Sequence, residues 1–154
     1  MPEHGLFNQA NEEWDAGHVK RAFELFMKAA QQGDRYALNS IGYFYDHGIA
    51  VRRNTAKALF WYLKALRSGD RIAYANIGTV YRDRRHFERA RFWFLQAIRV
   101  GDDGDAALKL AKLHLARRSQ LDLAQAAKYL RLALKFANIT GASIVEAKRL
   151  LGRV

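Results

Sequence analysis

The histidines and acidic residues of this chain do not form a pattern typical of catalysis or metal binding. The five histidines are scattered, and none stands at metal-ligand spacing from another. The segment 101–105, Gly-Asp-Asp-Gly-Asp, lacks the downstream glutamate of a calcium loop. Nucleophile elbows, phosphate loops and dinucleotide motifs are absent from the sequence. We therefore expect no catalytic residue, no metal and no cofactor, and we predict that the chain is not an enzyme.

The basic residues form a more regular pattern. The chain has 26 lysines and arginines against 15 acidic residues, a formal net charge of +11. Arginines gather in three short segments: Arg52 and Arg53, then Arg82, Arg84 and Arg85, then Arg117 and Arg118. A guanidinium group suits carboxylates and phosphates, so the charge favours an anionic partner. Two plainer interpretations stay open: the charge only keeps the protein soluble, or these are solvated arginines favoured at helix C-termini.

A repeated cassette supplies the scaffold for these segments. It has alanine at its first and eighth positions and aromatic or leucine residues at its fourth and fifth. The four copies are Ala22/Leu25/Phe26/Ala29, Ala58/Trp61/Tyr62/Ala65, Ala90/Trp93/Phe94/Ala97 and Ala126/Tyr129/Leu130/Ala133. Their first alanines recur every 32 or 36 residues, which indicates a helix-pair repeat. Helical spacing predicts core packing, rather than base stacking, for Phe60, Trp61, Tyr62, Phe92, Trp93 and Phe94.

A second pattern marks the partner helices. Gly42, Gly78 and Ala111 each precede a ring, Tyr45, Tyr81 or His114, by three residues. The small residue lets the facing helix approach closely, and the ring falls on the same face, so His114 is predicted to lie in or near the core. Turns are predicted at Gly33-Asp34, Gly69-Asp70 and Gly101-Asp102, with glycine ending one helix and aspartate capping the next. Ser143 and Glu146 match a capping box.

These signals predict nine helices, at 6–17, 20–32, 36–47, 55–68, 72–84, 87–100, 105–117, 122–137 and 142–152. We expect one domain over residues 1–154. Its four helix pairs cover 6–34, 35–70, 71–102 and 103–138, and a C-terminal cap covers 139–154. The N-terminus does not read as a signal peptide, and no apolar run is long enough to span a bilayer, so we expect a cytoplasmic protein.

Residues 45–69 resemble the Sel-one-like repeat. The segment has Tyr-x-x-Gly-x-Ala-Val-x-x-Asn-x-x-Lys-Ala-x-x-Trp-Tyr-x-x-Ala before Gly69, and Ala50, Asn54 and Leu66 depart from the family pattern. The loop between Tyr81 and Ala90 lacks the glycine-valine insert, and that unit is similar to a tetratricopeptide repeat. The resemblance implies an all-α, right-handed α-α superhelix of about four antiparallel pairs plus a capping helix, serving as a non-enzymatic adaptor or scaffold.

The resemblance also implies a concave face lined by the first helix of each pair. Its candidate residues here are Tyr36, Asn39, Ser40, Tyr43, His47, Ala75, Asn76, Thr79, Arg82, Lys109 and Lys112. Asn39, Asn76, Lys109 and Lys112 only partly match the clamp with which tetratricopeptide proteins hold a carboxylate. Equivalent turns stack in a solenoid, so Arg52, Arg53, Arg84, Arg85, Arg117 and Arg118 are expected to form a basic edge, opposite an edge with Asp34, Asp70, Asp102, Asp103 and Asp105.

We therefore predict a protein-interaction module that binds an acidic protein or peptide through the concave face and the basic edge. Two alternatives remain: a bacterial immunity or chaperone-like protein that binds a cognate toxin or effector, and a basic nucleic-acid-associated repeat protein. The apolar cap around Ile144, Leu150 and Leu151 also makes a homodimer conceivable.

Overall fold

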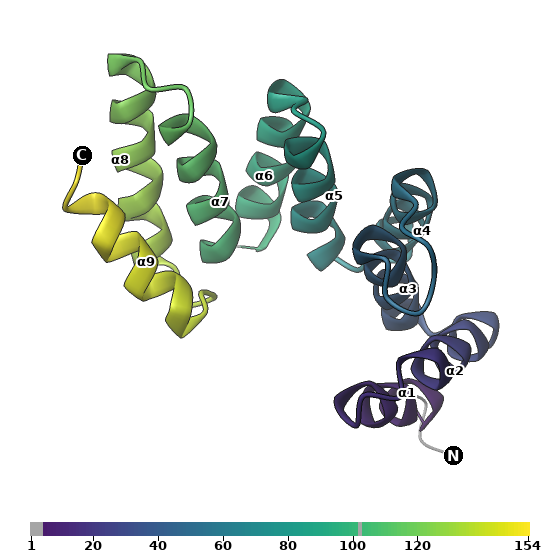
Figure 1. Ribbon diagram of the computed structural model, residues 1–154. Coiled ribbons are helices and arrows are strands. Elements are labelled where there is room, and N and C mark those ends of the chain that lie inside the picture. Colours follow the sequence, from purple (N-terminus) through teal and green to yellow (C-terminus); the bar gives the residue numbers. More distant parts are fainter. Residues whose placement is uncertain (1–4, 102) are drawn as a thin grey trace. The chain divides into compact units, whose positions relative to one another are not determined.

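The computed structural model describes residues 5–101 and 103–154, and the chain is all-α there, as predicted (Figure 1). Each predicted helix is present, with ends within two residues of those expected. The described helices are α1 (Gly5–Asp15), α2 (Val19–Gln31), α3 (Arg35–His47), α4 (Thr55–Arg67), α5 (Ile72–Asp83), α6 (Phe87–Gly101), α7 (Gly104–Leu115), α8 (Gln120–Lys135) and α9 (Gly141–Leu151).

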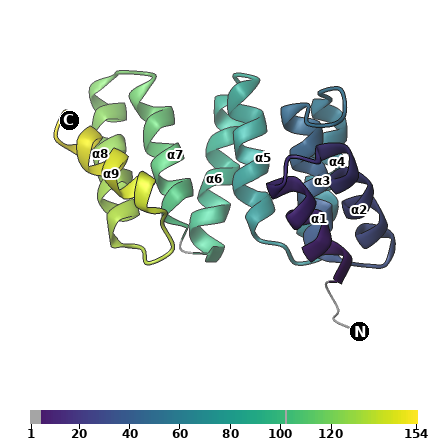
Figure 2. The same cartoon turned by 60° about the horizontal axis from the view of Figure 1, so that its bottom comes forward.

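The chain divides into two compact units, Met1–Val80 and Tyr81–Val154, and the boundary falls within α5. In the first unit α1 packs on α2, α2 on α3, and α3 on α4. In the second unit α6 packs on α7 and α7 on α8, and α9 lies against α8 in both views of the ribbon (Figure 2). The organisation of residues 1–154 as a single domain stays a prediction.

The alanine cassettes form the buried face of the second helices. The first, fifth and eighth positions of each cassette are buried: Ala22, Phe26, Ala29, Ala58, Tyr62, Ala65, Ala90, Phe94, Ala97, Ala126, Leu130 and Ala133. In the first unit the rings of Phe26 and Phe44 meet at 5.6 Å, edge to face, and Trp14 packs on both. Alanine on one helix and rings on the other let the helices interdigitate, which is how the repeat builds its core.

Gly42 shows why one first helix needs a residue without a side chain. A Cβ atom at this position would lie 2.6 Å from Tyr62 Cδ1, which is closer than real Cβ contacts. The Tyr62 ring is 1% exposed and makes a hydrogen bond to the Asp46 carboxylate. Burial, followed by the charge of Asp46, raises the pKa of the Tyr62 hydroxyl far above its usual range. The predicted close approach is confirmed at Gly42.

The prediction that all six aromatic residues in the two cassette runs pack in the core is wrong for Phe60 and Phe92. Their side chains are 59% and 53% exposed. Each ring packs edge to face on the next residue, Trp61 or Trp93, with ring centroids 5.4 Å apart in both cases. Consecutive helical residues lie about 100° apart around the axis, so a run of three aromatics cannot turn every ring inward.

This difference in burial predicts losses of stability of very different size for two phenylalanines on α6. Phe94→Ala is expected to cost about 3–5 kcal/mol of unfolding free energy, because Phe94 is fully buried. Phe92→Ala is expected to cost less than about 1 kcal/mol, since it loses little more than one aromatic pair. Urea unfolding at neutral pH measures both variants. Equal losses would show that the two rings share one environment.

The turns use the predicted caps in two of the three places. Gly33 and Gly69 have left-handed backbone, with φ of +91° and +92°. Asp34 accepts from the backbone N–H groups of Tyr36 and Ala37, and Asp70 accepts from Ile72 N–H at 3.0 Å. The third turn differs: Gly101 is still within α6, Asp102 lies outside the described residues, and Asp103 caps α7 by accepting from Ala106 N–H.

The predicted capping box at the last helix is also wrong. Thr140 is the N-cap of α9, and its hydroxyl accepts from the N–H of Ser143, which lies inside the first turn. The Thr140 hydroxyl and N–H also donate to Asp105 on α7, at 3.0 and 3.2 Å. Glu146 instead pairs with Arg149 through two contacts of 2.9 Å. A tertiary contact with Asp105 therefore helps to fix where this helix begins.

Asp70 gives a pH-dependent prediction. Its side chain is 4% exposed, and burial raises its pKa against the weaker opposing effects of the Ile72 N–H and Arg35. Folding therefore favours the protonated form, so the contribution of Asp70 to stability falls as the pH rises through the pKa of the folded state. Asp70→Asn keeps the cap and removes the buried charge. It is expected to raise the unfolding midpoint at pH 7.

The pH dependence separates the removal of a buried charge from a stabilisation by Asp70→Asn that does not depend on ionisation. The advantage of Asp70→Asn should shrink below about pH 4, where aspartate itself becomes neutral. Asp34→Asn is the matched control, because Asp34 caps the preceding repeat but is only half-buried. Urea midpoints between pH 3 and 8 measure both variants. A destabilised Asp70→Asn at pH 7 would contradict the account.

Candidate functional site

Two of the basic turns lie side by side in the second unit. The turn after α5 carries Arg84 and Arg85, the turn after α7 carries Arg117 and Arg118, and all four side chains are exposed. Arg117 Nη1 lies 3.1 Å from Glu88 Oε1 in the first turn of α6, which links the two turns. One of the four arginines of these two turns is therefore already paired, and the basic edge formed by all the turns stays a prediction.

Arg85 and Arg118 occupy left-handed backbone positions, with φ of +61° and +59°. For residues other than glycine, this conformation is less stable than right-handed backbone by roughly 1–2 kcal/mol. Ala50, in the turn after α3, has the same geometry with φ of +59° and stands where the Sel-one-like pattern has glycine. An arginine side chain at such a position costs stability that glycine would recover, which is a feature found at functional sites.

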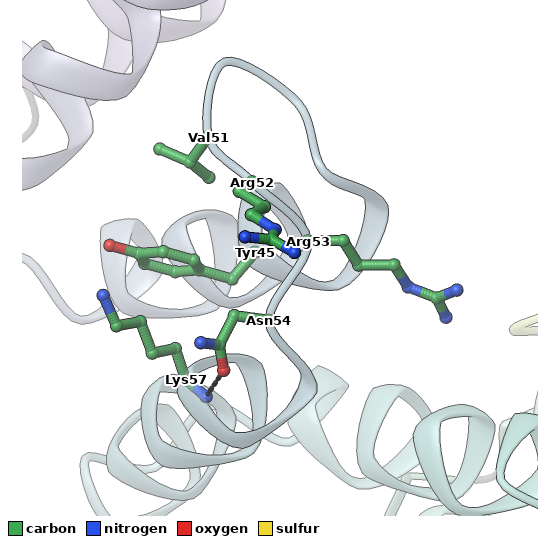
Figure 3. Close-up of a pocket in the computed structure, with 6 residues that line it drawn as sticks. All are labelled: Tyr45, Val51, Arg52, Arg53, Asn54 and Lys57. Atoms are coloured by element: carbon green, nitrogen blue, oxygen red, sulfur yellow. Dashed lines mark hydrogen bonds between the residues drawn. The ribbon is translucent and has the colours of Figure 1, made fainter.

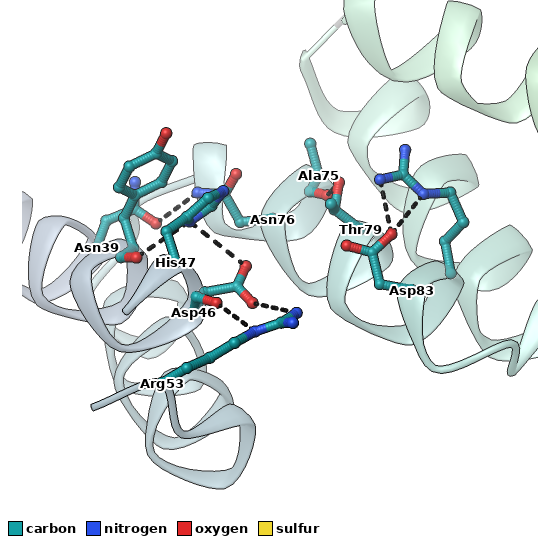
Figure 4. Close-up of polar contacts among 10 residues, drawn as sticks. Asn39, Asp46, His47, Arg53, Ala75, Asn76, Thr79 and Asp83 are labelled. Carbon is teal, nitrogen blue, oxygen red and sulfur yellow. Dashed lines mark hydrogen bonds and ion pairs between the residues drawn. The ribbon is translucent and has the colours of Figure 1, made fainter. Parts of the chain in front are cut away.

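In the first unit, Arg53 is held by Asp46. Arg53 Nε donates to the Asp46 carbonyl oxygen at 2.8 Å, and its Nη2 lies 4.0 Å from the carboxylate (Figure 4). Asp46 is 6% exposed and also lies 4.0 Å from His47 Nδ1. The sequence analysis did not single out Asp46. Its signal is its place one helical turn after Gly42, on the face that meets Tyr62.

The first-helix candidates of the first unit form a connected polar and aromatic surface. Asn76 Nδ2 donates to Asn39 Oδ1 at 3.0 Å, which joins α5 to α3 (Figure 4). Tyr43 and His47 stack with ring centroids 3.9 Å apart, and Trp14 packs on Tyr43 at 5.6 Å. The remaining candidates on these helices are partly or well exposed: Tyr36, Ser40 and Thr79, whereas Ala75 is buried.

The first-helix candidates of the second unit are largely occupied by acidic neighbours. Arg82 makes contacts of 2.7 and 2.9 Å to Asp83, and Lys112 Nζ lies 3.6 Å from Glu146 on α9. Burial lowers the pKa of the Lys109 ammonium, against the opposing pull of Asp103. Asn39, Asn76 and Lys112 thus already have polar partners within their own units, so the partial match to a carboxylate clamp gains no support.

His114 lies near the core, as predicted. It is 7% exposed, its ring stacks on Tyr129 at 5.8 Å, and its Nδ1 lies 2.9 Å from Asp122 Oδ1. Asp122 also accepts from the Ser119 hydroxyl at 2.6 Å. These two hydrogen bonds, that of His114 first, lower the pKa of the Asp122 carboxyl. The hydroxyl binds the carboxylate rather than the imidazole, so the three groups are not arranged as a nucleophile, base and orienting acid.

Within residues 5–101 and 103–154, no cluster of three or more histidine or acidic side chains could hold a metal ion. Over the same ranges, no helix is both long and apolar enough to cross a bilayer.

Known proteins that resemble this chain contain the same kind of helical repeat. Residues 19–34, 35–70, 74–102 and 104–135 match the family model of the Sel1 repeat. A Sel1 repeat protein from Oxalobacter formigenes superimposes with a TM-score of 0.72 at 22% identity, over 95% of this chain and 61% of that one. The c5321 protective antigen of uropathogenic Escherichia coli, which displays the same repeat fold, gives 0.62 at 28% identity, over 84% and 28%.

This chain thus spans less than two thirds of the length of either solved structure. No curated protein matches the sequence. The family model covers most of the chain, and the described helices and both solved structures show the same architecture, an all-α helical-repeat solenoid. The chain belongs to the Sel1 repeat family.

Proposed function

We propose that this chain is a non-enzymatic interaction module that binds an acidic protein or peptide. Sel1 repeat proteins are in general protein-interaction modules, and the net charge of +11 selects for acidic partners. The proposed binding surface has two parts. One is the first-helix surface: Tyr36, Asn39, Tyr43, His47, Asn76, Thr79, Arg82, Lys109 and Lys112. The other is the set of basic turns: Arg52, Arg53, Arg84, Arg85, Arg117 and Arg118.

The observation that carries the proposal is the backbone at Arg85 and Arg118. Both arginines sit at left-handed positions in exposed turns, where glycine would be more stable. A charged side chain retained there at a cost to stability is best explained by a contact that the side chain makes with a partner. Arg84, next to Arg85, has an exposed side chain on the same turn.

Within the first-helix surface, the first unit is the better candidate for direct contact. Tyr36 is 37% exposed, and His47 and Tyr43 offer stacked rings beside the amide pair of Asn39 and Asn76. Aromatic side chains with polar groups nearby are the common anchors of protein interfaces. Arg82 and Lys112, by contrast, must give up an acidic neighbour before they can bind a partner.

Capture from a lysate of the source cells tests this function. The wild-type chain is expected to retain acidic proteins, and reversal of Arg52, Arg53, Arg84 and Arg85 to glutamate is expected to release them. The control reverses Lys64, Arg67, Arg99 and Arg131, four exposed residues of the second helices, by the same total charge. The same partners on the turn variant and on the wild type would refute the role of the turns. A toxin or effector encoded beside this gene is the first specific partner to test.

A nucleic-acid-associated role is the second candidate, because Phe60 and Phe92 are exposed beside basic residues and could stack on bases. Binding of a mixed-sequence single-stranded oligonucleotide should then survive near-physiological salt and weaken at least tenfold in the Phe60→Ala, Phe92→Ala double variant. Binding that disappears at that salt concentration, or that ignores the double variant, would mark the attraction as a general effect of charge.

A further inference from the structure

A pocket lies beside the turn between α3 and α4, which is longer than the turn between α5 and α6. Its volume is about 570 Å³, and it is lined by Tyr45, Val51, Arg52, Arg53, Asn54 and Lys57 (Figure 3). The turn runs from Gly48 to Asn54 and contains the loop insert that the turn between α5 and α6 lacks. Val51, Arg52 and Arg53, which line the pocket, belong to this insert.

The lining is cationic and contains no carboxylate. Arg53 points away from the other lining residues, toward its contacts with Asp46 (Figure 3). Arg52 and Lys57 form no ion pair within the described part of the chain. Lys57 Nζ instead lies 5.2 Å from the centre of the Tyr45 ring, and the Tyr45 hydroxyl lies on the Lys57 side in Figure 3. Two uncompensated cations and a hydroxyl group are thus available to a ligand.

The backbone holds this pocket in place. Asn54 N–H donates to the Tyr45 carbonyl oxygen at 2.8 Å, and Ile49 N–H donates to that of Phe44 at 3.0 Å. The Asn54 side chain accepts from Lys57 N–H at 2.9 Å. Gly48 has a φ of +67°, and a Cβ atom there would lie 3.2 Å from Arg53 Cβ. A turn fixed at both ends presents its donors without a large ordering cost on binding.

We propose that this pocket binds the phosphate group of a phosphorylated side chain on the protein partner. A phosphate monoester carries close to two negative charges at neutral pH and several acceptor oxygens, which match Arg52, Lys57 and the Tyr45 hydroxyl. A carboxylate would neutralise only one of the two cations, and a nucleic-acid phosphodiester likewise carries one charge. The inference deepens the proposed function and rests on it, since it names the chemistry that one basic turn recognises.

Titration with O-phosphoserine, followed by backbone amide NMR shifts at constant ionic strength, tests the pocket. The amides of Tyr45, Asn54 and Lys57 are expected to shift in a saturable way with O-phosphoserine and with inorganic phosphate, and not with acetate at the same concentration. Arg52→Gln with Lys57→Gln should weaken this binding at least tenfold. Lys64→Gln with Arg67→Gln, farther along α4, is the matched control and should leave it unchanged.

Equal amide shifts with acetate, or equal weakening by the control pair, would contradict the phosphate site. Saturable phosphate binding that is unchanged by Arg52→Gln with Lys57→Gln would contradict it as well. Phosphatase treatment of a captured partner separates this inference from the proposed function. If the treated partner binds as tightly as before, the phosphate proposal fails and the interaction function stands. If the pocket binds O-phosphoserine but the chain retains no acidic protein, the interaction function fails while the pocket stands.

Discussion

Gly42→Leu is expected to lower the free energy of unfolding by about 3 kcal/mol, because it forces a large side chain into a well-packed contact between two helices. The new side chain would begin 2.6 Å from the Tyr62 ring. The Tyr62 ring is restrained, because it is 1% exposed and its hydroxyl is hydrogen-bonded to Asp46. Since α3 and α4 meet at this point, the leucine side chain can be accommodated only if the two helices of this repeat move apart.

A graded series separates this close approach from a general intolerance of glycine exchange. Gly42→Ala should cost less, because the clash of one methyl group is offset by about 1 kcal/mol of helix propensity. Gly101→Ala is the matched control: Gly101 ends α6 with no atom within 4 Å of an added Cβ, and the exchange should be neutral or stabilising. Urea unfolding measures all three variants. A Gly42→Leu protein as stable as the wild type would show that the helices do not depend on the close approach.

The helices could be predicted from the sequence because each repeat carries its own hydrophobic period. Alanine and a large ring one helical turn apart, as in Ala58 and Tyr62, identify the buried face without knowledge of any distant residue. The same rule failed at Phe60 and Phe92, where three aromatics in a row hide the period. The prediction there followed residue type alone, whereas the position of each residue around the helix axis decides which ring is buried.

Caps were predictable where a turn is closed locally. Asp34 and Asp70 bind N–H groups two or three residues ahead, so Gly-Asp identified both caps. The same signal failed at Gly101-Asp102, because Gly101 lies within α6 and Asp103 caps α7. Thr140 was missed because its role includes a contact with Asp105, 35 residues earlier in the chain. Such a contact depends on how α9 lies against its neighbours, and no local pattern contains that information.

The candidate site, like the caps, could be predicted only where the signal is local in the sequence. The arginine turns and the polar first-helix residues stand out by position, whereas their acidic partners do not. Glu88 lies 29 residues from Arg117, and Asp46 is seven residues from Arg53 across a turn. Which cations remain available, and which are already neutralised, is therefore a property of the folded units and not of the repeat pattern.

Arg85→Gly with Arg118→Gly is expected to stabilise the protein and weaken partner binding at the same time. Each exchange relieves a left-handed backbone position, which is worth about 1 kcal/mol per site. Each also removes an exposed guanidinium group from the basic turns. Loss of binding in a more stable protein cannot be attributed to unfolding, an explanation that stays open for charge reversal at Arg53, beside the buried Asp46.

The matched control removes the same charge from another surface. Arg99→Gln with Arg131→Gln changes two exposed arginines on α6 and α8, outside the turns, and lowers the net charge equally. If long-range attraction alone drew the partner to the protein, both double variants would lose affinity to the same extent. Direct contact at the turns predicts a loss for the glycine pair and little change for the glutamine pair.

The dissociation constant of a captured acidic partner, measured by calorimetry at physiological salt for the wild type and the two double variants, tests the central claim most directly. We predict that Arg85→Gly with Arg118→Gly binds at least about tenfold more weakly, equivalent to about 1.4 kcal/mol, while its unfolding midpoint rises. Arg99→Gln with Arg131→Gln should stay within about twofold of the wild type. Wild-type affinity in the glycine pair, or equal losses in both pairs, would contradict a binding role for these turns.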